Sequence, residues 1–152
     1  MRGAQCLVWS ALSLAVMWMG APARAADYLI RFGDVRGSEG NLAISPTRSI
    51  KFCDKSTGYR FGYEIVPGDG GAYRFATVFH LPAPGNVTFK NAEIRSDGTE
   101  VRTVSETVRG RFVADFHFDS GDPAGRWQID VMVNDRKVQT VEFNVVPASV
   151  CP

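Results

Sequence analysis

The 152-residue sequence has few of the residues that catalytic and metal sites commonly use, with only three cysteines and two histidines. It also lacks the nucleophile motif G-x-S-x-G, the phosphate-binding P-loop, H-E-x-x-H and C-x-x-C. A Ser-His-Asp triad would need His80 or His117 beside a serine and a buried acid. His80 precedes Leu81-Pro82 at the end of a strand, where we expect it to face solvent or cap a loop. We therefore predict no catalytic residue, no cofactor site and no enzymatic activity.

Neither sign of charge is in excess. Seventeen basic side chains stand against 16 acidic ones, giving a net charge of +1. Such a balance offers no electrostatic footprint for nucleic acid or for anionic lipid. Hydrophobic residues make up 45% of the chain and charged residues 22%. These proportions are ordinary for a globular domain and exclude collagen-like, coiled-coil and disordered classes.

Long apolar runs are absent except near the start of the chain. Arg2 is followed by an apolar run from Cys6 to Gly20 and then by the small-x-small sequence Ala23-Arg24-Ala25. This order is typical of a secretory signal peptide. The run is shorter than the roughly 20 residues that span a bilayer. We predict a signal peptide at residues 1–25, a mature chain that begins at or near Ala26, and one domain at residues 26–152 that does not insert into a membrane.

The cysteines fit this export prediction. Cys6 lies in the predicted signal peptide, which leaves Cys53 and Cys151 as one pair for an oxidising compartment. We predict that these two form a structural disulfide. In the chain-entropy model, closing a loop of about 99 residues stabilises a fold by about 4 to 5 kcal/mol. Two unpaired thiols are the alternative.

Apolar and polar residues alternate between frequent turn residues, which is typical of β-strands, and no window of eleven or more residues resembles an amphipathic helix. Arg36–Pro46 is expected to be a loop, and Ser49–Cys53 a short strand-like piece. The remaining strands are expected at Tyr28–Phe32, Tyr59–Ile65, Tyr73–Leu81, Val87–Ile94, Val101–Val108, Phe112–Phe118, Trp127–Val133 and Val141–Val145. About seven or eight short strands predict an all-β, antiparallel sandwich, with a small closed barrel as the alternative.

The last forty residues carry the clearest alternation. It predicts a core that contains Phe112, Phe116, Trp127, Ile129, Val131, Phe143 and Val145. Asn134-Asp135 is expected to form the turn between the last two strands. Val138 departs from the alternation, which indicates a β-bulge just after that turn.

Three segments carry a family resemblance: Gly125–Val131 (GRWQIDV), Val141–Val145 (VEFNV) and Tyr59–Tyr63 (YRFGY). The first two resemble the closing strand pair of immunoglobulin-like domains in bacterial exported proteins. Together, over about residues 57–146, the segments resemble a family of small uncharacterised periplasmic proteins of Gram-negative bacteria, known as a domain of unknown function. The resemblance implies an immunoglobulin-like β-sandwich and a periplasmic location, and it implies no activity. Unlike the core cysteines of antibody domains, Cys53 and Cys151 do not flank Trp127.

Asp115, His117 and Asp119 are the most suggestive polar set. On a strand they would project from one face about 7 Å apart, with Asp122 in the turn that follows. Histidine and carboxylates together can bind zinc or copper. These positions alternate with Phe112, Ala114, Phe116 and Phe118, however, so we expect them to face solvent. We predict no metal site, and whether this face binds a metal stays open.

Charges of both signs also alternate between Arg95 and Arg111, at Asp97, Glu100, Arg102, Glu106 and Arg109. A solvated face is one interpretation, and a strand edge that binds a partner is the other. We therefore expect a periplasmic or secreted, non-enzymatic binding or structural module of the bacterial envelope. Its partner would be an envelope protein that contacts an edge strand or loops, and not a nucleic acid. The alternative is a periplasmic carrier of a small ligand or a metal.

Overall fold

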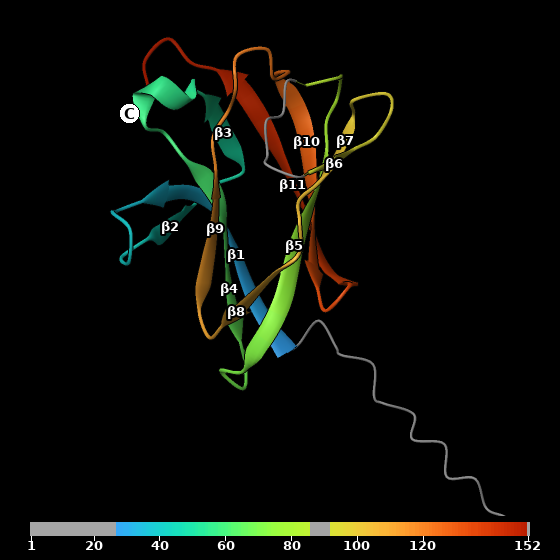
Figure 1. Ribbon diagram of the computed structural model, residues 1–152. Helices are drawn as coiled ribbons and strands as arrows, with labels where there is room; N and C mark the ends of the chain where they lie inside the picture. The colour runs from blue at the N-terminus through green and yellow to red at the C-terminus, as the bar shows by residue number, and fades with distance from the viewer. Residues whose placement is uncertain (1–26, 86–91, 152) are drawn as a thin grey trace, which may run out of the picture.

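The computed structural model describes residues 27–85 and 92–151 (Figure 1). The predicted signal peptide, the expected mature start at Ala26 and much of the predicted strand Val87–Ile94 lie outside the described residues. In the part that is described, the chain forms eleven strands and one short 3-10 turn at Lys55–Thr57. None of the helical structure found there is long and apolar enough to cross a membrane.

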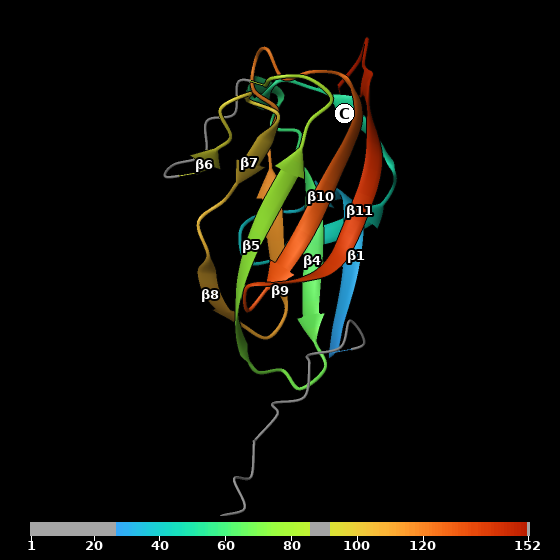
Figure 2. The same ribbon diagram turned by 90° about the vertical axis from the view of Figure 1, so that its right-hand side faces the viewer.

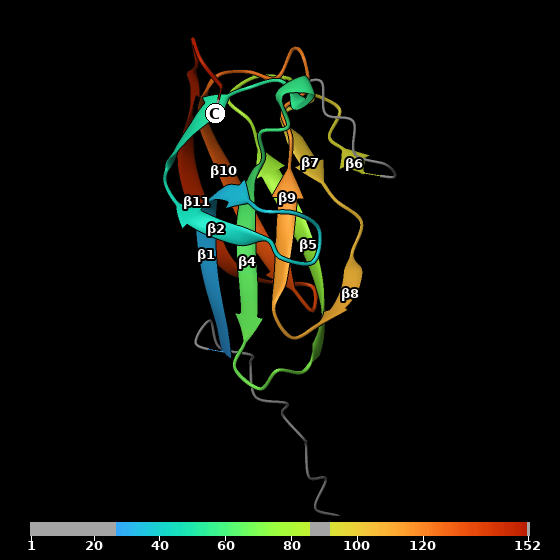
Figure 3. The ribbon, with the colours of Figure 1, turned by 90° about the vertical axis from the view of Figure 1, so that its left-hand side faces the viewer.

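The first sheet has four antiparallel strands in the order β2-β1-β4-β9 (Figure 3). Their bounds are β1 Tyr28–Arg36, β2 Ala43–Pro46, β4 Phe61–Pro67 and β9 Phe112–Phe116. β2 and β9 are therefore the edges of this sheet. We call it sheet A.

The second sheet, sheet B, packs against the first and is seen face-on in Figure 2. Its strands follow the order β3-β11-β10-β5-β7-β6, and β8 pairs with the other half of the β5 edge. Their bounds are β3 Ser49–Phe52, β5 Ala72–His80, β6 Glu93–Ile94, β7 Glu100–Arg102, β8 Glu106–Arg109, β10 Gly125–Val133 and β11 Arg136–Pro147. The sandwich prediction is confirmed, and the barrel alternative is wrong because the two sheets do not close on each other.

The core lies between the sheets and is rich in aromatic rings. Six of the seven predicted core residues are buried, and Phe112 is partly buried against the same cluster. Phe61 of β4 stacks on Phe118 with ring centroids 4.5 Å apart. The Trp127 indole N–H donates to the Pro123 carbonyl over 2.8 Å, which satisfies the one polar atom of that buried ring.

Two expectations at the start of the chain are wrong. β1 does not stop at Gly33-Asp34 but continues to Arg36, and β2 occupies the second half of the expected loop Arg36–Pro46. Glycine here does not mark a turn. A Cβ atom on Gly33 would lie 2.1 Å from the Ser45 carbonyl oxygen of β2, so the missing side chain lets the β2 backbone approach.

The predicted strand Val101–Val108 is also wrong as a single strand, because it is divided into β7 and β8. At the break, Thr103 N–H donates to the Thr77 carbonyl, while the Thr103 hydroxyl accepts from Thr77 N–H at 2.9 Å. The side chain thus replaces a backbone acceptor, and Val104-Ser105 leaves the ladder. This division and the unexpected strand β2 are the two reasons why the described strands outnumber those expected.

The closing hairpin agrees with the sequence. Asn134 and Asp135 have φ angles of 48° and 63°, as a tight two-residue hairpin turn requires. Val131 pairs with Gln139, whereas Met132 pairs with Lys137. Val138 is therefore the extra residue on β11, and the predicted bulge is confirmed.

The predicted disulfide is present in the structure. Cys53 follows β3 and is buried, and Cys151 lies in the tail after β11, with the two Cα atoms 5.8 Å apart. The bond adds a covalent link where β3 pairs in parallel with β11. It fixes the end of the chain against an early strand.

Candidate functional site

An apolar hollow lies on the flank of the sandwich, where β9 at the edge of sheet A faces β8 and the segment between β7 and β8 of sheet B. Figure 1 shows β9 and β5 on opposite sides of this flank, with β8 crossing toward the lower end. The hollow has a volume of about 330 Å³. It is lined by Phe75, Thr103, Val104, Glu106 and all of β9, from Phe112 to Phe116. Val104 is 48% exposed, which is high for a large apolar side chain.

The pairing of the neighbouring strands shows how the β9 backbone is oriented. Val35 N–H donates to the Arg60 carbonyl, just beyond the β1–β4 ladder. Hydrogen-bonded pairs alternate along antiparallel strands, so Phe61, Tyr63 and Ile65 direct their backbone groups toward β9. Their β9 partners at positions 112, 114 and 116 bond back to β4. Val113 and Asp115 therefore turn their N–H and C=O groups away from β4 and toward the hollow.

The edge strands differ in how well they are protected against pairing. On this side of sheet B the edges are β6, which covers β7 and has two residues, and β8, which has four, and very short edge strands are one of the ways in which proteins blunt a sheet edge. β2 and β3 are four residues each. β9 is five residues long, has no proline, lysine or glycine, and pairs on one side only among the described strands.

The charged residues between Arg95 and Arg111 follow the predicted pattern only in part. Arg95 and Glu100 pair with each other at the surface, which fits a solvated face. Arg111 instead donates to the buried carboxylate of Glu64 and to the Leu42 carbonyl, so it ties the β8–β9 turn to sheet A. β8 lies inside this charged segment and pairs only with β5 among the described strands, so the partner-edge interpretation of the segment stays a prediction, and β9 begins directly after it.

Asp115, His117 and Asp119 do not converge on one point. Asp115 forms an ion pair with Arg60 at 3.1 Å, and His117 Nδ1 lies 3.3 Å from the Tyr59 carbonyl oxygen. Asp119 lies beyond β9, in a turn where its N–H donates to Asp122. Across residues 27–85 and 92–151, no three histidine, cysteine, aspartate or glutamate side chains are grouped as a metal site. As the alternation predicts, His117 is exposed while Phe116 is buried.

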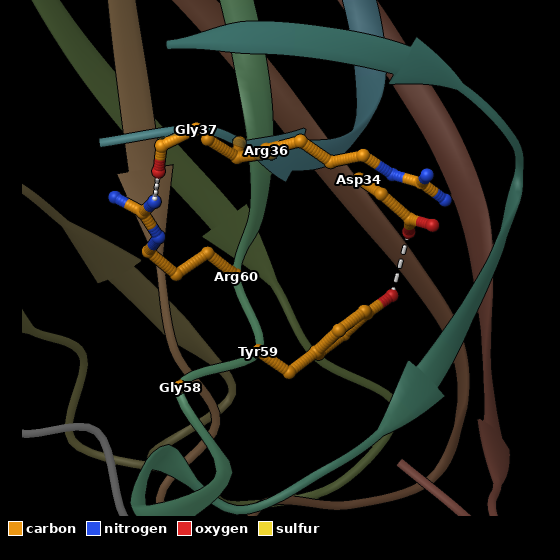
Figure 4. Close-up of a pocket in the computed structure, with 7 residues that line it drawn as sticks. Asp34, Arg36, Gly37, Gly58, Tyr59 and Arg60 are labelled. Atoms are coloured by element: carbon orange, nitrogen blue, oxygen red, sulfur yellow. Dashed lines mark hydrogen bonds between the residues drawn. The ribbon is translucent and has the colours of Figure 1, made fainter. Parts of the chain in front are cut away.

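A second hollow, of about 380 Å³, lies where β1 ends beside the start of β4 (Figure 4). Tyr59 O–H donates to Asp34 at 2.6 Å, and Arg60 donates to the Gly37 carbonyl at 2.5 Å. Burial, together with the bond to Asp34, raises the pKa of Tyr59 well above its ordinary value. Arg36 is exposed at the rim, so its guanidinium can contact a small anion.

The sequence reasoning missed a polar cluster on the outer face of sheet B. His80 is 35% exposed, and its Nε2 lies 3.1 Å from Asp130 and its Nδ1 3.5 Å from Glu100. Asp130 also accepts from Thr140 at 2.6 Å and from Lys137 at 3.4 Å. Burial raises the pKa of Asp130, but the bonds from Thr140, His80 and Lys137 outweigh it and hold that pKa below its ordinary value. The cluster connects β7, β5, β10 and β11.

Strand alternation was the signal available for this cluster. It places Asp130 and His80 on the outer faces of their strands, opposite Ile129 and Phe79. It does not say that β5 lies next to β10, so the two residues could not be brought together from sequence. Each donor or acceptor named in the cluster has a partner within it, and that arrangement holds strands together.

Two open sheets that pack face to face around a buried aromatic core define the class of β-sandwiches. Within that class, the chain belongs to the PM0630 beta sandwich domain family, whose model matches residues 30–146. The family resemblance seen in the sequence is thereby confirmed. Among solved structures, the chain is similar to an immunoglobulin-like protein from Pseudomonas aeruginosa. Identity is 18% and the TM-score is 0.46, over 78% of this chain and 92% of that one. No curated protein matches the sequence.

Proposed function

We propose that this protein is a non-enzymatic binding module that receives a protein partner on the flank between β9 of sheet A and β8 of sheet B. The observation that carries the proposal is the hollow beside β9, where apolar side chains lie next to a strand that pairs on one side only among the described strands. Exposed strand edges are common sites of protein association. The exposed side chain of Val104 extends the apolar surface at the mouth of the hollow.

The polar groups near this flank support a binding role over a chemical one. His80 and Asp130 are held in a cluster that joins strands of sheet B, and His117 faces solvent beside the Tyr59 carbonyl. The hollow itself is lined mainly by aromatic and aliphatic side chains, with Glu106 and Asp115 as its charged residues. Such a lining suits capture of apolar side chains.

Site-specific photocrosslinking tests this proposal. A benzophenone amino acid would replace Val104 at the hollow or, as a matched control, Leu29, which is 50% exposed on β1. In cells that produce the full chain, we expect Val104 to crosslink one protein partner reproducibly and Leu29 not to do so. Mass spectrometry would identify the crosslinked segment of that partner. Equal crosslinking from both positions, or none from Val104, would contradict a partner site on this flank.

We also propose that the protein acts in the periplasm or outside the cell. Support comes from Arg2, the apolar run Cys6–Gly20 and the small residues Ala23 and Ala25. The disulfide between Cys53 and Cys151 fits an oxidising compartment. N-terminal sequencing of the exported protein should find Ala26 or a residue within one or two of it. An intact Met1 would contradict this proposal.

A small-ligand carrier is the second candidate, favoured by the hollow in Figure 4. Arg36 would bind a carboxylate there, since Arg60 is already paired with Asp115 and the Gly37 carbonyl, and Asp34 would accept from a neighbouring hydroxyl of the ligand. Titration with glucuronate, followed by amide chemical shifts, tests this candidate. Shifts confined to the lining residues and lost in Arg36→Ala would favour the carrier, with Arg31→Ala as the control outside the hollow.

A further inference from the structure

We infer that β9 binds its partner by β-strand addition, in which an extended segment of the partner pairs antiparallel with β9 and places an apolar side chain beside Ala114. This inference rests on the proposed binding function and specifies how the partner is held. It requires backbone groups that are free to pair, room for side chains, and charges that match the segment.

The backbone of β9 meets the first requirement. The alternation along β4 directs the N–H and C=O groups of Val113 and Asp115 away from sheet A. Two residues of this kind on an antiparallel strand form up to four hydrogen bonds with an added strand. All pairs in sheet A are antiparallel, so an antiparallel segment continues the existing pattern of twist and pairing.

The lining of the hollow meets the second requirement. Phe112, Ala114 and Phe116 share the inner face of β9, and Ala114 is the smallest of the three. The hollow beside them is also lined by Phe75 of β5 and by Val104. An added strand whose alternate side chains point inward would therefore place a valine- or isoleucine-sized group next to Ala114, out of water.

Charge at the mouth of the hollow indicates what flanks that apolar group. Glu106, which is exposed on β8, and the partly exposed carboxylate of Asp115 are the charged residues that line the hollow. Asp115 is already paired with Arg60, which leaves Glu106 as the carboxylate available to a partner. We therefore assign the occupant as an extended segment with alternating apolar residues and flanking basic residues.

A synthetic peptide provides the probe. Acetyl-Lys-Thr-Val-Thr-Val-Thr-Val-Thr-Lys-amide has valines on one face, threonines on the other and a lysine at each end. With the peptide bound to the full mature protein, we expect slower hydrogen exchange at the amides of Val113 and Asp115. Val113→Pro removes one outward N–H without removing a bond to β4, and we expect peptide affinity to fall about tenfold. Val113→Thr keeps the N–H and should bind nearly as the wild type does.

Methylated peptides test the same point without altering the protein. In an antiparallel addition, the residues that bond to Val113 and Asp115 have side chains on the outer face, so they are the threonines. N-methylation of the threonines should abolish binding, whereas N-methylation of the valines should not. The reverse result would overturn the antiparallel arrangement. Binding that survives threonine methylation and Val113→Pro would overturn strand addition.

The two proposals fail separately. If Val104 crosslinks a partner reproducibly but no extended peptide slows hydrogen exchange at Val113 and Asp115, the binding site is supported and strand addition is wrong. Absence of crosslinking from Val104 would instead contradict the binding function on which the inference rests.

Discussion

The hydroxyl groups of Tyr63 and Thr77 form a buried hydrogen bond of 2.5 Å between the two sheets. Tyr63 lies on β4 and Thr77 on β5, and neither side chain is exposed. Burial raises the pKa of Tyr63 well above its ordinary value, so the phenol stays protonated and able to donate. This bond is a specific polar contact inside an otherwise aromatic core, so it selects one packing of the sheets.

Removal of one partner of this bond should cost more than removal of both. We expect Tyr63→Phe to lower the free energy of unfolding by about 1 to 3 kcal/mol, because the Thr77 hydroxyl then loses its partner in the core. The double variant Tyr63→Phe/Thr77→Val should recover part of that loss. Urea denaturation of the four proteins in this cycle measures the coupling. Additive single effects would show that the bond contributes little.

Because of Asp130, the free energy of unfolding should fall in acid. Its folded pKa lies below the ordinary value of about 3.9, so the carboxylate contributes stability above that value and loses it as pH falls through the folded pKa. We expect Asp130→Asn to be about 1 to 3 kcal/mol less stable near neutral pH. The difference in unfolding free energy between the wild type and Asp130→Asn should become smaller below about pH 4. Chemical denaturation at several pH values tests this, with exposed Asp135→Asn as the control. If that difference in unfolding free energy stays the same in acid, the Asp130 carboxylate does not stabilise the fold in the way proposed.

The disulfide should contribute strongly to stability because its cysteines are 98 positions apart. Cys53→Ser/Cys151→Ser should lower the free energy of unfolding by about 4 to 5 kcal/mol in the chain-entropy model. Reduction of the wild-type protein should have a similar effect. Thiol labelling of the unfolded, unreduced protein provides the check on the bond itself, and a count of two free thiols would contradict it.

Folding should not depend on the side chains of Asp115, His117 and Asp119. Replacing Asp115, His117 and Asp119 with serine removes the partly exposed ion pair of Asp115 with Arg60, which contributes about 0 to 1 kcal/mol, and the contact of exposed His117 with the Tyr59 carbonyl. We expect a nearly unchanged melting transition and unchanged partner capture. Calorimetric titration of the wild-type protein with zinc and copper is the second measurement. Micromolar or tighter binding that disappears in the triple variant would instead favour a metal carrier.

Much of the fold could be predicted because alternation records which face of each strand is buried. The residues around Trp127 and Phe143 are inward as expected, and the irregular position of Val138 marked the bulge. With Cys6 placed in the predicted signal peptide, the remaining cysteines left a single pair. Gly33 was misread because glycine signals both turns and close approaches between strands, and the sequence pattern does not separate the two.

The candidate site was decided by the tertiary structure. Alternation gives the face of a strand but not its neighbour, so it could not show that β9 ends sheet A while β8 belongs to sheet B. For the same reason, the contact between His80 and Asp130 could not be predicted: they are 50 residues apart in the chain and meet only because β5 pairs with β10. Pairing between strands depends on contacts distant in sequence, and these form only when the whole sandwich assembles.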